Sequence, residues 1–461
     1  MFVGRERELQ DWEARWQGSQ AELVVLYGRR RVGKSALARR FSEGRPSVYF
    51  TGVPVRDADN RHAFAAALGA EGVTFDTWEA AWDRLLERAN GQRLLVVLDE
   101  FPALAGSHPG LTGLLQRWWD ARGAASRLFV VLSGSSLGFI EREVLSHRSP
   151  LFGRRTASLK LAPLAPWEIA PFVPGHDPLD RLATHGLFGG VPAYLERVLA
   201  AGGWRPFLLR EAFSPGGYLF EEVPFLLNTE LREPATYLSL LSALASGATR
   251  QTEVADRAHL DVHAAGRYLA TLIELGLVAR ETPFFDPSPE KSRKGLYRVA
   301  DPFVRFWCAH VLPARSLIQA GLGERHLQER VLPQLPTLLG PAFESDCREF
   351  VARRWHETHD AYALRVGRQW HKERDGSVTE LDLVAELSDG SRLVAECKAT
   401  RKPVGPDVLL TLKERALSLP PNDAGPTRLA VFTMAGLTAA AKDVATREGI
   451  EAVAGAAVYE G

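Results

Sequence analysis

The sequence predicts an α/β protein built from more than one domain. Short apolar runs alternate with segments of helical pattern between residues 23 and 164. Strands that are buried on both faces of a parallel sheet give such continuous apolar runs. A glycine-rich segment directly follows the first run, and a second series of helix and strand patterns begins near residue 337. These three observations favour a parallel-sheet core at the start of the chain and a separate α/β module at its end.

Length and composition limit the possible classes of protein. A chain of 461 residues is too long for one hydrophobic core, so we expect about two to four domains. Basic and acidic residues balance at 56 each, so any contact with DNA must come from local patches. Cys308, Cys347 and Cys397 lie far apart, which predicts reduced thiols. The absence of a long apolar stretch or secretory signal predicts a cytoplasmic protein without a membrane partner.

The first two predicted domains are a core at residues 1–164 and a helical lid at residues 165–235. The core has helical patterns near residues 63–68 and 80–89, between the apolar runs. The lid segment is rich in proline, glycine and amphipathic helix. The predicted strands of the core are ELVVLY, SVYFTG, RLLVVLDE, RLFVVLSGSS and ASLKLAPL.

Residues 236–300 have the outline of a winged helix, with three short helical patterns followed by a two-stranded wing. The third helix, predicted over the segment VHAAGRYLATLIELGLV, carries Arg267, and the wing loop carries Lys291, Arg293 and Lys294. Such a module binds DNA in some proteins and serves as a rigid lid in others, and both alternatives stay open. A helical connector is predicted at residues 301–336 and the last domain at 337–461.

The glycine-rich segment fits the pattern GxxxxGK[ST], placed between an apolar strand and a helix. In this context the backbone wraps phosphates, Lys34 reaches the terminal phosphates, and Ser35 ligates Mg²⁺. The sequence therefore predicts a site for ATP and Mg²⁺. The residues assigned to it are Gly28, Arg29, Arg30, Arg31, Val32, Gly33, Lys34, Ser35 and Ala36.

Acidic and hydroxyl side chains at the ends of two later strands complete this site. Asp99 is expected to hold Mg²⁺, and Glu100 to polarise the attacking water as the catalytic base. Ser133, in the segment SGSS, is a candidate sensor of the γ-phosphate, although a plain serine-rich turn fits equally well. Arg154, next to Arg155, is a candidate arginine finger, with a surface arginine pair as the alternative.

Carboxylates also converge in the last domain. The segment ELDLVAELSDGSRLVAECK predicts a hairpin in which Asp382 lies on one strand, and Glu396 and Lys398 share one face of the other. Glu344 lies on the preceding helix. Two acids and a lysine on adjacent strands suit Mg²⁺-dependent phosphodiester hydrolysis. The alternative is a solvated hairpin with cross-strand salt bridges.

The chain resembles the archaeal-type P-loop ATPase family, which is AAA-related and lies near the STAND branch. The resemblance runs over essentially the whole chain. It implies that Gly4 and Arg5 lie near the adenine, and that the Gly-x-Pro motif at Gly190, Val191 and Pro192 marks a lid facing the nucleotide. The motifs that carry it, in order, are FVGRERELQ, YGRRRVGKSAL, LLVVLDEFP, LSGSS, PLFGRR and HGLFGGVPAYL.

The final domain resembles the restriction-endonuclease-like PD-(D/E)XK fold, although the proline of that name is absent. The resemblance implies that Asp382 and Glu396 ligate a metal, that Lys398 is catalytic, and that Glu344 supports the metal site. The expected architecture is thus an α/β P-loop ATPase core with a helical lid, a winged helix and a C-terminal nuclease-like α/β domain.

Three functional hypotheses follow. The first is an ATPase whose nucleotide state controls a nuclease acting on DNA or another nucleic acid. The second is a regulatory or DNA-binding ATPase with a catalytically inactive nuclease-like domain. The third is a scaffold that uses ATP to control assembly into a homo-oligomer.

Overall fold

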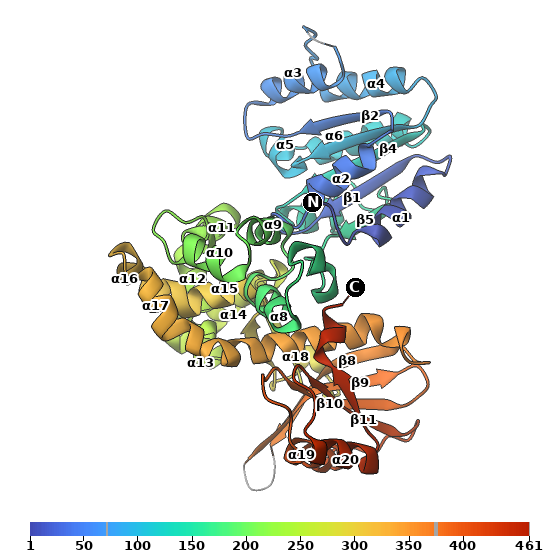
Figure 1. The fold of residues 1–461 in the computed structure, drawn as a ribbon. Coiled ribbons are helices and arrows are strands. Elements are labelled where there is room, and N and C mark those ends of the chain that lie inside the picture. The colour runs from blue at the N-terminus through green and yellow to red at the C-terminus, as the bar shows by residue number, and fades with distance from the viewer. Residues whose placement is uncertain (71, 373–376, 461) are drawn as a thin grey trace. The chain divides into compact units, whose positions relative to one another are not determined.

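The computed structural model describes residues 1–70, 72–372 and 377–460. The chain folds into two compact units (Figure 1). The first contains Met1–Pro163 and Val191–Ala193, and the second contains Leu164–Gly190 and Tyr194–Gly461. Within the described ranges, none of the helices combines the length and the apolar character that a membrane crossing requires.

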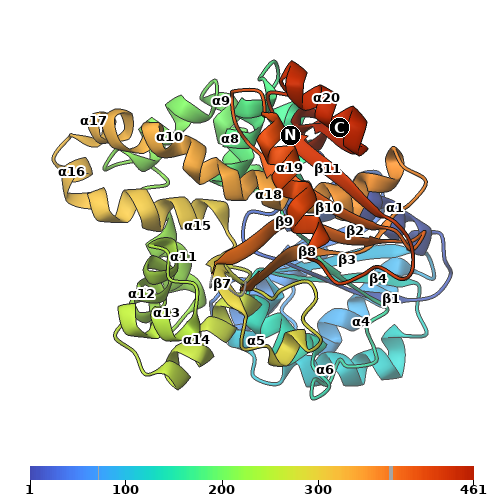
Figure 2. The ribbon, with the colours of Figure 1, turned by 90° about the horizontal axis from the view of Figure 1, so that it is seen from below.

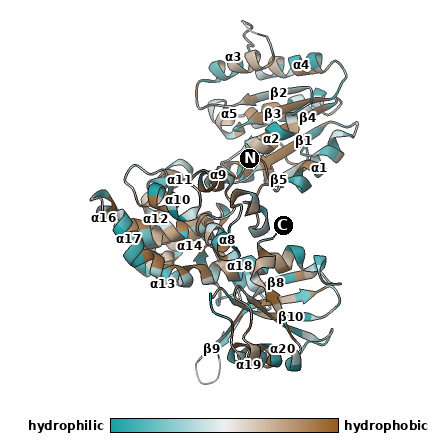
Figure 3. Ribbon diagram, in the orientation of Figure 1, coloured by the Kyte–Doolittle hydropathy of each residue, from teal (hydrophilic) through white to brown (hydrophobic). Residues whose placement is uncertain are grey.

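The first unit is built on a five-stranded parallel sheet in the order β2-β3-β4-β1-β5. The predicted parallel sheet is confirmed, because all neighbouring strands pair in parallel. Every residue of β3 and β4 is buried, as expected for central strands of such a sheet. In Figure 3 hydrophobic residues run along β1 and β3. The strands are β1 (Glu22–Tyr27), β2 (Ser47–Thr51), β3 (Leu94–Asp99), β4 (Leu128–Gly134) and β5 (Ala157–Lys160).

Helices cover both faces of this sheet, so the central strands are buried on two sides. On one face Trp12 of α1 and Phe41 of α2 pack against Phe129. On the other, Trp78 and Trp82 belong to a core formed with α3 to α6. The helices are α1 (Glu6–Trp16), α2 (Lys34–Ser42), α3 (Asp57–Ala67), α4 (Trp78–Ala89), α5 (Phe101–Ser107), α6 (Leu111–Trp118) and α7 (Leu137–Phe139).

The second unit begins with a helical region. Three of its helices, α12 to α14, precede the antiparallel strands β6 and β7, which is the element order predicted for residues 236–300. The expected third helix was too long: α14 ends at Glu274, because Gly276 adopts a φ of 69° and a strand follows. The elements are α8 (Pro178–Phe188), α9 (Pro192–Ala200), α10 (Trp204–Ala212), α11 (Glu222–Glu230), α12 (Pro234–Ala245), α13 (Gln251–Arg257), α14 (Val262–Glu274), β6 (Val278–Glu281), β7 (Leu296–Val299), α15 (Pro302–Phe306), α16 (Arg315–Gln319) and α17 (Gly323–His326).

A mixed five-stranded sheet, in the order β12-β11-β10-β9-β8, forms the C-terminal part of this unit. The long helix α18 lies beside this sheet in both Figure 1 and Figure 2, and α19 and α20 contribute to a core with β9, β10 and β11. The predicted hairpin is confirmed: β9 and β10 pair antiparallel, and Gly390 takes a φ of 82° in the turn. The elements are α18 (Leu335–Arg354), β8 (Ala363–Lys372), β9 (Val378–Leu387), β10 (Arg392–Lys398), α19 (Pro406–Leu417), β11 (Thr427–Thr433), α20 (Ala439–Glu448) and β12 (Ile450–Ala454).

Candidate functional site

The glycine-rich loop runs from the end of β1 at Tyr27 to the start of α2 at Lys34. Gly33 has a φ of 99°, a conformation that L side chains rarely adopt. At Gly28 an added Cβ would lie 2.4 Å from the carbonyl oxygen of Leu161, so only glycine fits there. The loop is therefore a backbone cradle at a helix N-terminus, which suits the phosphates of ATP.

Lys34 and Ser35 follow the loop, and Ser35 contacts the end of β3. The Nζ atom of Lys34 donates to the carbonyl oxygens of Gly28 and Arg29, at 2.8 Å each. Ser35 Oγ donates to Asp99 Oδ2 at 2.7 Å. A hydroxyl and a carboxylate oxygen thus lie together beside the loop, and these are ligands that Mg²⁺ prefers. The predicted contact between the loop region and Asp99 is present, although the two strands are not neighbours as the sequence suggested, because β4 lies between β1 and β3.

Tyr49 is a residue at this site that sequence reasoning missed. Its hydroxyl donates to Asp99 Oδ2 at 2.7 Å, from strand β2 beside β3. Burial and this hydrogen bond raise the pKa of Tyr49 to about 12, so the phenol stays protonated at neutral pH. Tyr49 is therefore a fixed donor that orients the Asp99 carboxylate. The apolar run SVYFT contains the tyrosine, but only the strand order places it beside Asp99.

Glu100 follows directly after β3 and has a φ of 50°, which is uncommon for a residue with a side chain. Ser135 Oγ lies 3.1 and 3.2 Å from its two carboxylate oxygens and donates to them. Ser133 was predicted as a sensor of the γ-phosphate, and that role stays a prediction. Ser133 is completely buried in β4, and within the described residues its hydroxyl has no hydrogen-bond partner. The serine that contacts the candidate base is Ser135.

The other predicted nucleotide-site residues of the first unit lie in the glycine-rich loop, beside it, or in the first turn of α2. Arg5, which is 5% exposed, donates from Nη2 to the carbonyl oxygens of Val32 and Ala162, and so holds the loop backbone. Gly4 precedes it with a φ of 68°. Pro192 lies beside the loop, 3.9 Å from where a Cβ of Gly33 would stand. Arg29, Arg30, Arg31 and Val32 lie within the loop, and Ala36 is exposed in the first turn of α2.

Arg154, the predicted finger, forms a two-point interaction with Asp120 in this structure. Its Nε and Nη2 atoms lie 3.1 and 3.0 Å from the two carboxylate oxygens. The neighbouring Arg155 donates to the carbonyl oxygen of Leu145. Within the described residues, the hydrogen bonds of this arginine pair are thus to the first unit itself, and the finger role stays a prediction.

The second candidate centre forms where β9 and β10 pair. Lys398 Nζ lies 2.5 Å from Glu396 Oε1 and 3.9 Å from Asp382 Oδ2. The backbone N–H of Cys397 donates to Asp382 Oδ2 at 2.9 Å. Asp382 and Glu396 are only 9% and 6% exposed. The structure thus brings these three predicted residues together, with both acids buried.

Burial and neighbouring carboxylates shift the pKa values of two acids and the lysine at this centre. Burial, and then the nearby Asp382, raise the pKa of Glu344 to about 6. Burial and Asp382 also raise the pKa of Glu396. For Lys398, burial opposes the charge, but the Glu396 carboxylate outweighs it and the pKa rises. The centre therefore favours a bound positive charge.

The donors present at this centre fit a divalent cation in part. Glu396 Oε2 is buried and, among the described residues, accepts no hydrogen bond; Arg415 Nη1 lies 3.6 Å from it. An unsatisfied buried carboxylate oxygen suits a metal ligand. Across residues 1–70, 72–372 and 377–460, however, no three His, Cys, Asp or Glu side chains gather as a metal site. The predicted ligands Glu344, Asp382 and Glu396 thus do not form a preformed three-residue metal site. The match to a divalent cation depends on Asp382 and Glu396.

The parallel sheet, the glycine cradle and the contact of Ser35 with Asp99 define a P-loop nucleotide-binding protein. Residues 2–198 match a family described as an ATPase domain predominantly from Archaea, and residues 307–409 match one described as archaeal and bacterial proteins of unknown function. An uncharacterised protein of Methanocaldococcus jannaschii is 30% identical over 397 residues, covering 85% of this chain and 85% of that protein. The chain belongs to the archaeal-type P-loop ATPase family.

Two further similarities were found. An uncharacterised ATP-binding protein of the same organism is 49% identical over 45 residues, which cover 10% of this chain and 76% of that one. The Walker-type ATPase PABY2304 of Pyrococcus abyssi is 19% identical, with a TM-score of 0.48, covering 67% of this chain and 96% of that chain. The family assignment supports ATP binding and hydrolysis by this chain, with Mg²⁺ as the usual companion of the nucleotide.

Proposed function

We propose that ATP, bound at the P-loop, controls a magnesium-dependent nuclease centre formed by Asp382, Glu396 and Lys398. The observation that carries this proposal is the burial of both acids against one lysine, with one carboxylate oxygen of Glu396 left without a hydrogen bond. A solvated hairpin with surface salt bridges would leave these acids exposed to water. Their burial therefore favours a built site over a charged sheet surface.

The roles in ATP hydrolysis follow from the contacts of the first centre. Ser35 and Asp99 supply oxygens for Mg²⁺, and Lys34 neutralises the terminal phosphates. Glu100 accepts the proton of the attacking water, and Ser135 fixes the orientation of its carboxylate. The bound Mg²⁺ would neutralise charge that develops on the phosphates.

The roles at the second centre follow from charge and burial. Asp382 and Glu396 would hold Mg²⁺, which would polarise a phosphodiester and its attacking water. Lys398, held between the two acids, would orient that water or stabilise the phosphate. Glu344, with its pKa raised to about 6, would support the metal or accept a proton near neutral pH.

The test is cleavage of plasmid DNA and labelled DNA and RNA oligonucleotides by the full chain, with Mg²⁺ or with EDTA. We expect the wild type to cleave in Mg²⁺ and not in EDTA. The variants Asp382→Ala and Lys398→Ala should lose this cleavage. Glu386→Ala is the matched control, because Glu386 is an exposed acid on the same strand. Cleavage that survives in both site variants would refute the assignment.

The alternative is a DNA-binding regulatory ATPase with an inactive nuclease-like domain. It is favoured by the exposed cations Lys291, Arg293 and Lys294 between β6 and β7, and by exposed Arg267 on α14. Such an arrangement suits phosphate contacts from a winged helix. Salt-sensitive DNA binding that is lost on replacing the three loop cations, with no cleavage under any metal condition, would support this alternative.

A further inference from the structure

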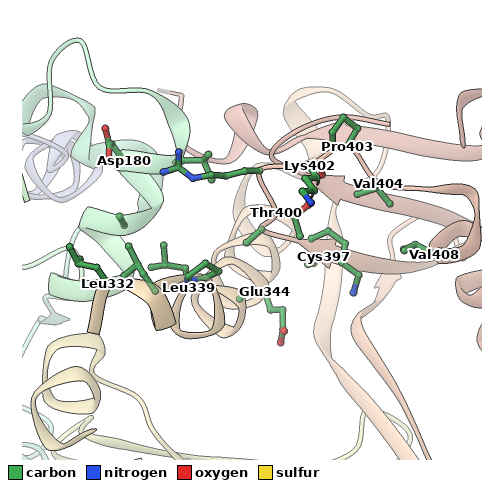
Figure 4. Close-up of a pocket in the computed structure, with 18 of the residues that line it drawn as sticks. Asp180, Leu332, Leu339, Glu344, Cys397, Thr400, Lys402, Pro403, Val404 and Val408 are labelled. Atoms are coloured by element: carbon green, nitrogen blue, oxygen red, sulfur yellow. Dashed lines mark hydrogen bonds between the residues drawn. The ribbon is translucent and has the colours of Figure 1, made fainter. Parts of the chain in front are cut away.

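A cavity of about 920 Å³ lies in the second unit, beside the candidate nuclease centre (Figure 4). Its walls come from three segments: α8 and the start of α10, the start of α18 with the turn before it, and the loop that joins β10 to α19. Glu344 and Lys398 line one part of it. The cavity is therefore continuous with residues assigned above to phosphodiester cleavage.

One wall of this cavity is apolar. Leu332, Leu335 and Leu339 come from α18 and the turn before it, and Val404 and Val408 come from the opposite side. Figure 4 shows Leu332 and Leu339 on the helical side and Val404 and Val408 across from them. Apolar side chains of this kind suit the flat, weakly polar face of a base.

The rim carries positive charge. Arg205, Arg401 and Lys402 line the cavity and are exposed. In the part of the chain that the structure describes, Arg401 and Lys402 form no ion pair with an acidic side chain. Their positive charge is thus available to an anion.

We propose that this cavity receives an unpaired nucleotide of the strand to be cut. Its base would lie against the leucine wall, and its phosphates would contact Arg401 and Lys402 on the way to Lys398. The inference rests on the proposed nuclease function and adds its substrate class, which is single-stranded or locally unpaired nucleic acid. A base stacked inside a duplex cannot enter such a cavity without leaving its stack.

Gly340 allows the cavity to be filled without disturbing the fold. It lies in α18 and lines the cavity, and an added Cβ would meet nothing within 4 Å. Gly340→Leu would place a side chain in the open space and would also favour the helix. Gly113→Leu is the matched control, since Gly113 lies in α6 of the first unit and its added Cβ would make only ordinary contacts.

The experiment measures binding of labelled oligonucleotides to the full chain in EDTA, by fluorescence anisotropy. The ligands are a single strand, a duplex of the same sequence, and a duplex with an unpaired bulge. We expect the single strand and the bulge to bind at least about 10-fold tighter than the duplex, and Gly340→Leu to weaken them about 10-fold. Gly113→Leu should bind all three as the wild type does.

Variants that remove a positive charge from the rim of the cavity test the proposal separately from Gly340→Leu. Lys402→Ala and Arg401→Ala should each lower the slope of log K against log salt by about 1. Lys442→Ala, which removes an exposed lysine on α20, should leave that slope unchanged. These variants keep the proposal testable if Gly340→Leu fails to fold, which its circular dichroism spectrum and thermal melt will reveal.

The outcomes separate the cavity from the nuclease assignment. If the wild type binds and cuts duplex as well as single strands, and Gly340→Leu changes neither, the cavity proposal is overturned while the nuclease function stands. Saturation of the cavity by a free mononucleotide that an oligonucleotide cannot displace would also overturn it, in favour of a small effector. If no nucleic acid of any form is bound or cut, the proposed nuclease function itself fails.

Discussion

The hydrogen bond from Ser135 to Glu100 is the contact at residue scale that most directly concerns ATP turnover. Ser135 donates to both carboxylate oxygens, so it fixes the direction in which the base can accept a proton. We expect Ser135→Ala to lower kcat for ATP about 10-fold with little change in KM, and Ser135→Thr to restore most of it.

Steady-state ATPase kinetics check this prediction. Ser133→Ala decides between the two serines, because the hydroxyl of Ser133 is buried and, within the described residues, makes no hydrogen bond. Its turnover should stay near that of the wild type. A rise in KM for Ser135→Ala without a fall in kcat would contradict a positioning role.

Lys34 and Glu100 should separate binding from hydrolysis. Lys34→Ala removes the charge that faces the terminal phosphates, so we expect turnover to fall at least about 100-fold. Glu100→Gln keeps the shape of the side chain but not its basicity, so ATP should bind while hydrolysis falls about 100-fold or more. Nucleotide binding by a fluorescent analogue and phosphate release measure the two effects. Normal turnover in both variants would refute the site.

The sequence predicted one part of this site and missed another for a physical reason. Lys34 and Ser35 belong to one short motif, and acids at the end of a parallel strand are expected at the same sheet edge. Tyr49 and Ser135 reach the site only because β2 and β4 are the neighbours of β3. Strand order is set by packing of the whole sheet, so local spacing could not identify these two residues.

At the scale of elements, a buried polar cluster joins α8, α18 and the end of the second unit. His185 Nδ1 lies 3.0 Å from Asp346 Oδ1, and the Tyr459 hydroxyl donates to Asp346 Oδ2 at 2.7 Å. Burial opposes the charge on His185, but Asp346 outweighs it and raises the pKa of the ring. Charged His185 therefore stabilises the packing of α8 against α18.

The pH dependence of stability follows from this shift. Because the folded pKa is raised, the contribution is fully present below the unfolded pKa of about 6.5 and is lost as the pH rises through the folded value. We expect the melting temperature of the wild type to exceed that of His185→Gln most at pH values below about 6.5. Thermal melts across pH measure the difference. A gap that widens as pH rises would show that the ring is neutral in the fold.

Gly190 fixes the turn between α8 and α9 by close approach. A Cβ there would lie 1.7 Å from the carbonyl oxygen of Leu164, and the Leu164 N–H donates to the Gly190 carbonyl at 2.7 Å. We expect Gly190→Ala to destabilise the second unit by about 1–3 kcal/mol. Gly216→Ala is the control, since a Cβ there meets nothing within 4 Å. Chemical denaturation measures both, and equal stabilities would contradict the close contact.

Element prediction from the sequence worked where a continuous apolar run or a turn motif had clear ends. The apolar runs of β1, β3 and β4 and the turn at Gly390 were predicted, because burial and backbone conformation there follow from a few adjacent residues. The end of α14 was placed too late, because the apolar residues Leu275, Leu277 and Val278 extend the apolar pattern beyond Glu274 into β6. Short apolar segments satisfy helix and strand patterns alike, and Gly276 decided the boundary.

At the scale of the whole molecule, the chain joins a nucleotide site in one unit to an acidic centre in the other. Its 56 basic and 56 acidic residues leave no net field, so the proposed contacts with nucleic acid would depend on local cations such as Lys398. The sequence indicated both centres, because each consists of motifs on short segments. It could not indicate the cavity, whose walls come from residues far apart in the chain.

Control of the proposed nuclease centre by nucleotide would require that ATP favour one conformation over another. Glu100→Gln should hold the ATP-bound state, because it binds ATP without hydrolysing it. We expect this variant, saturated with ATP, to cut single-stranded nucleic acid at a rate at least about 5-fold different from that with ADP, since coupling energies of about 1 kcal/mol or more give such factors. Lys34→Ala, which fails to engage the terminal phosphates, should show no difference between the two nucleotides. Equal cleavage rates for Glu100→Gln with ATP, with ADP and without nucleotide would mean that the two centres act independently.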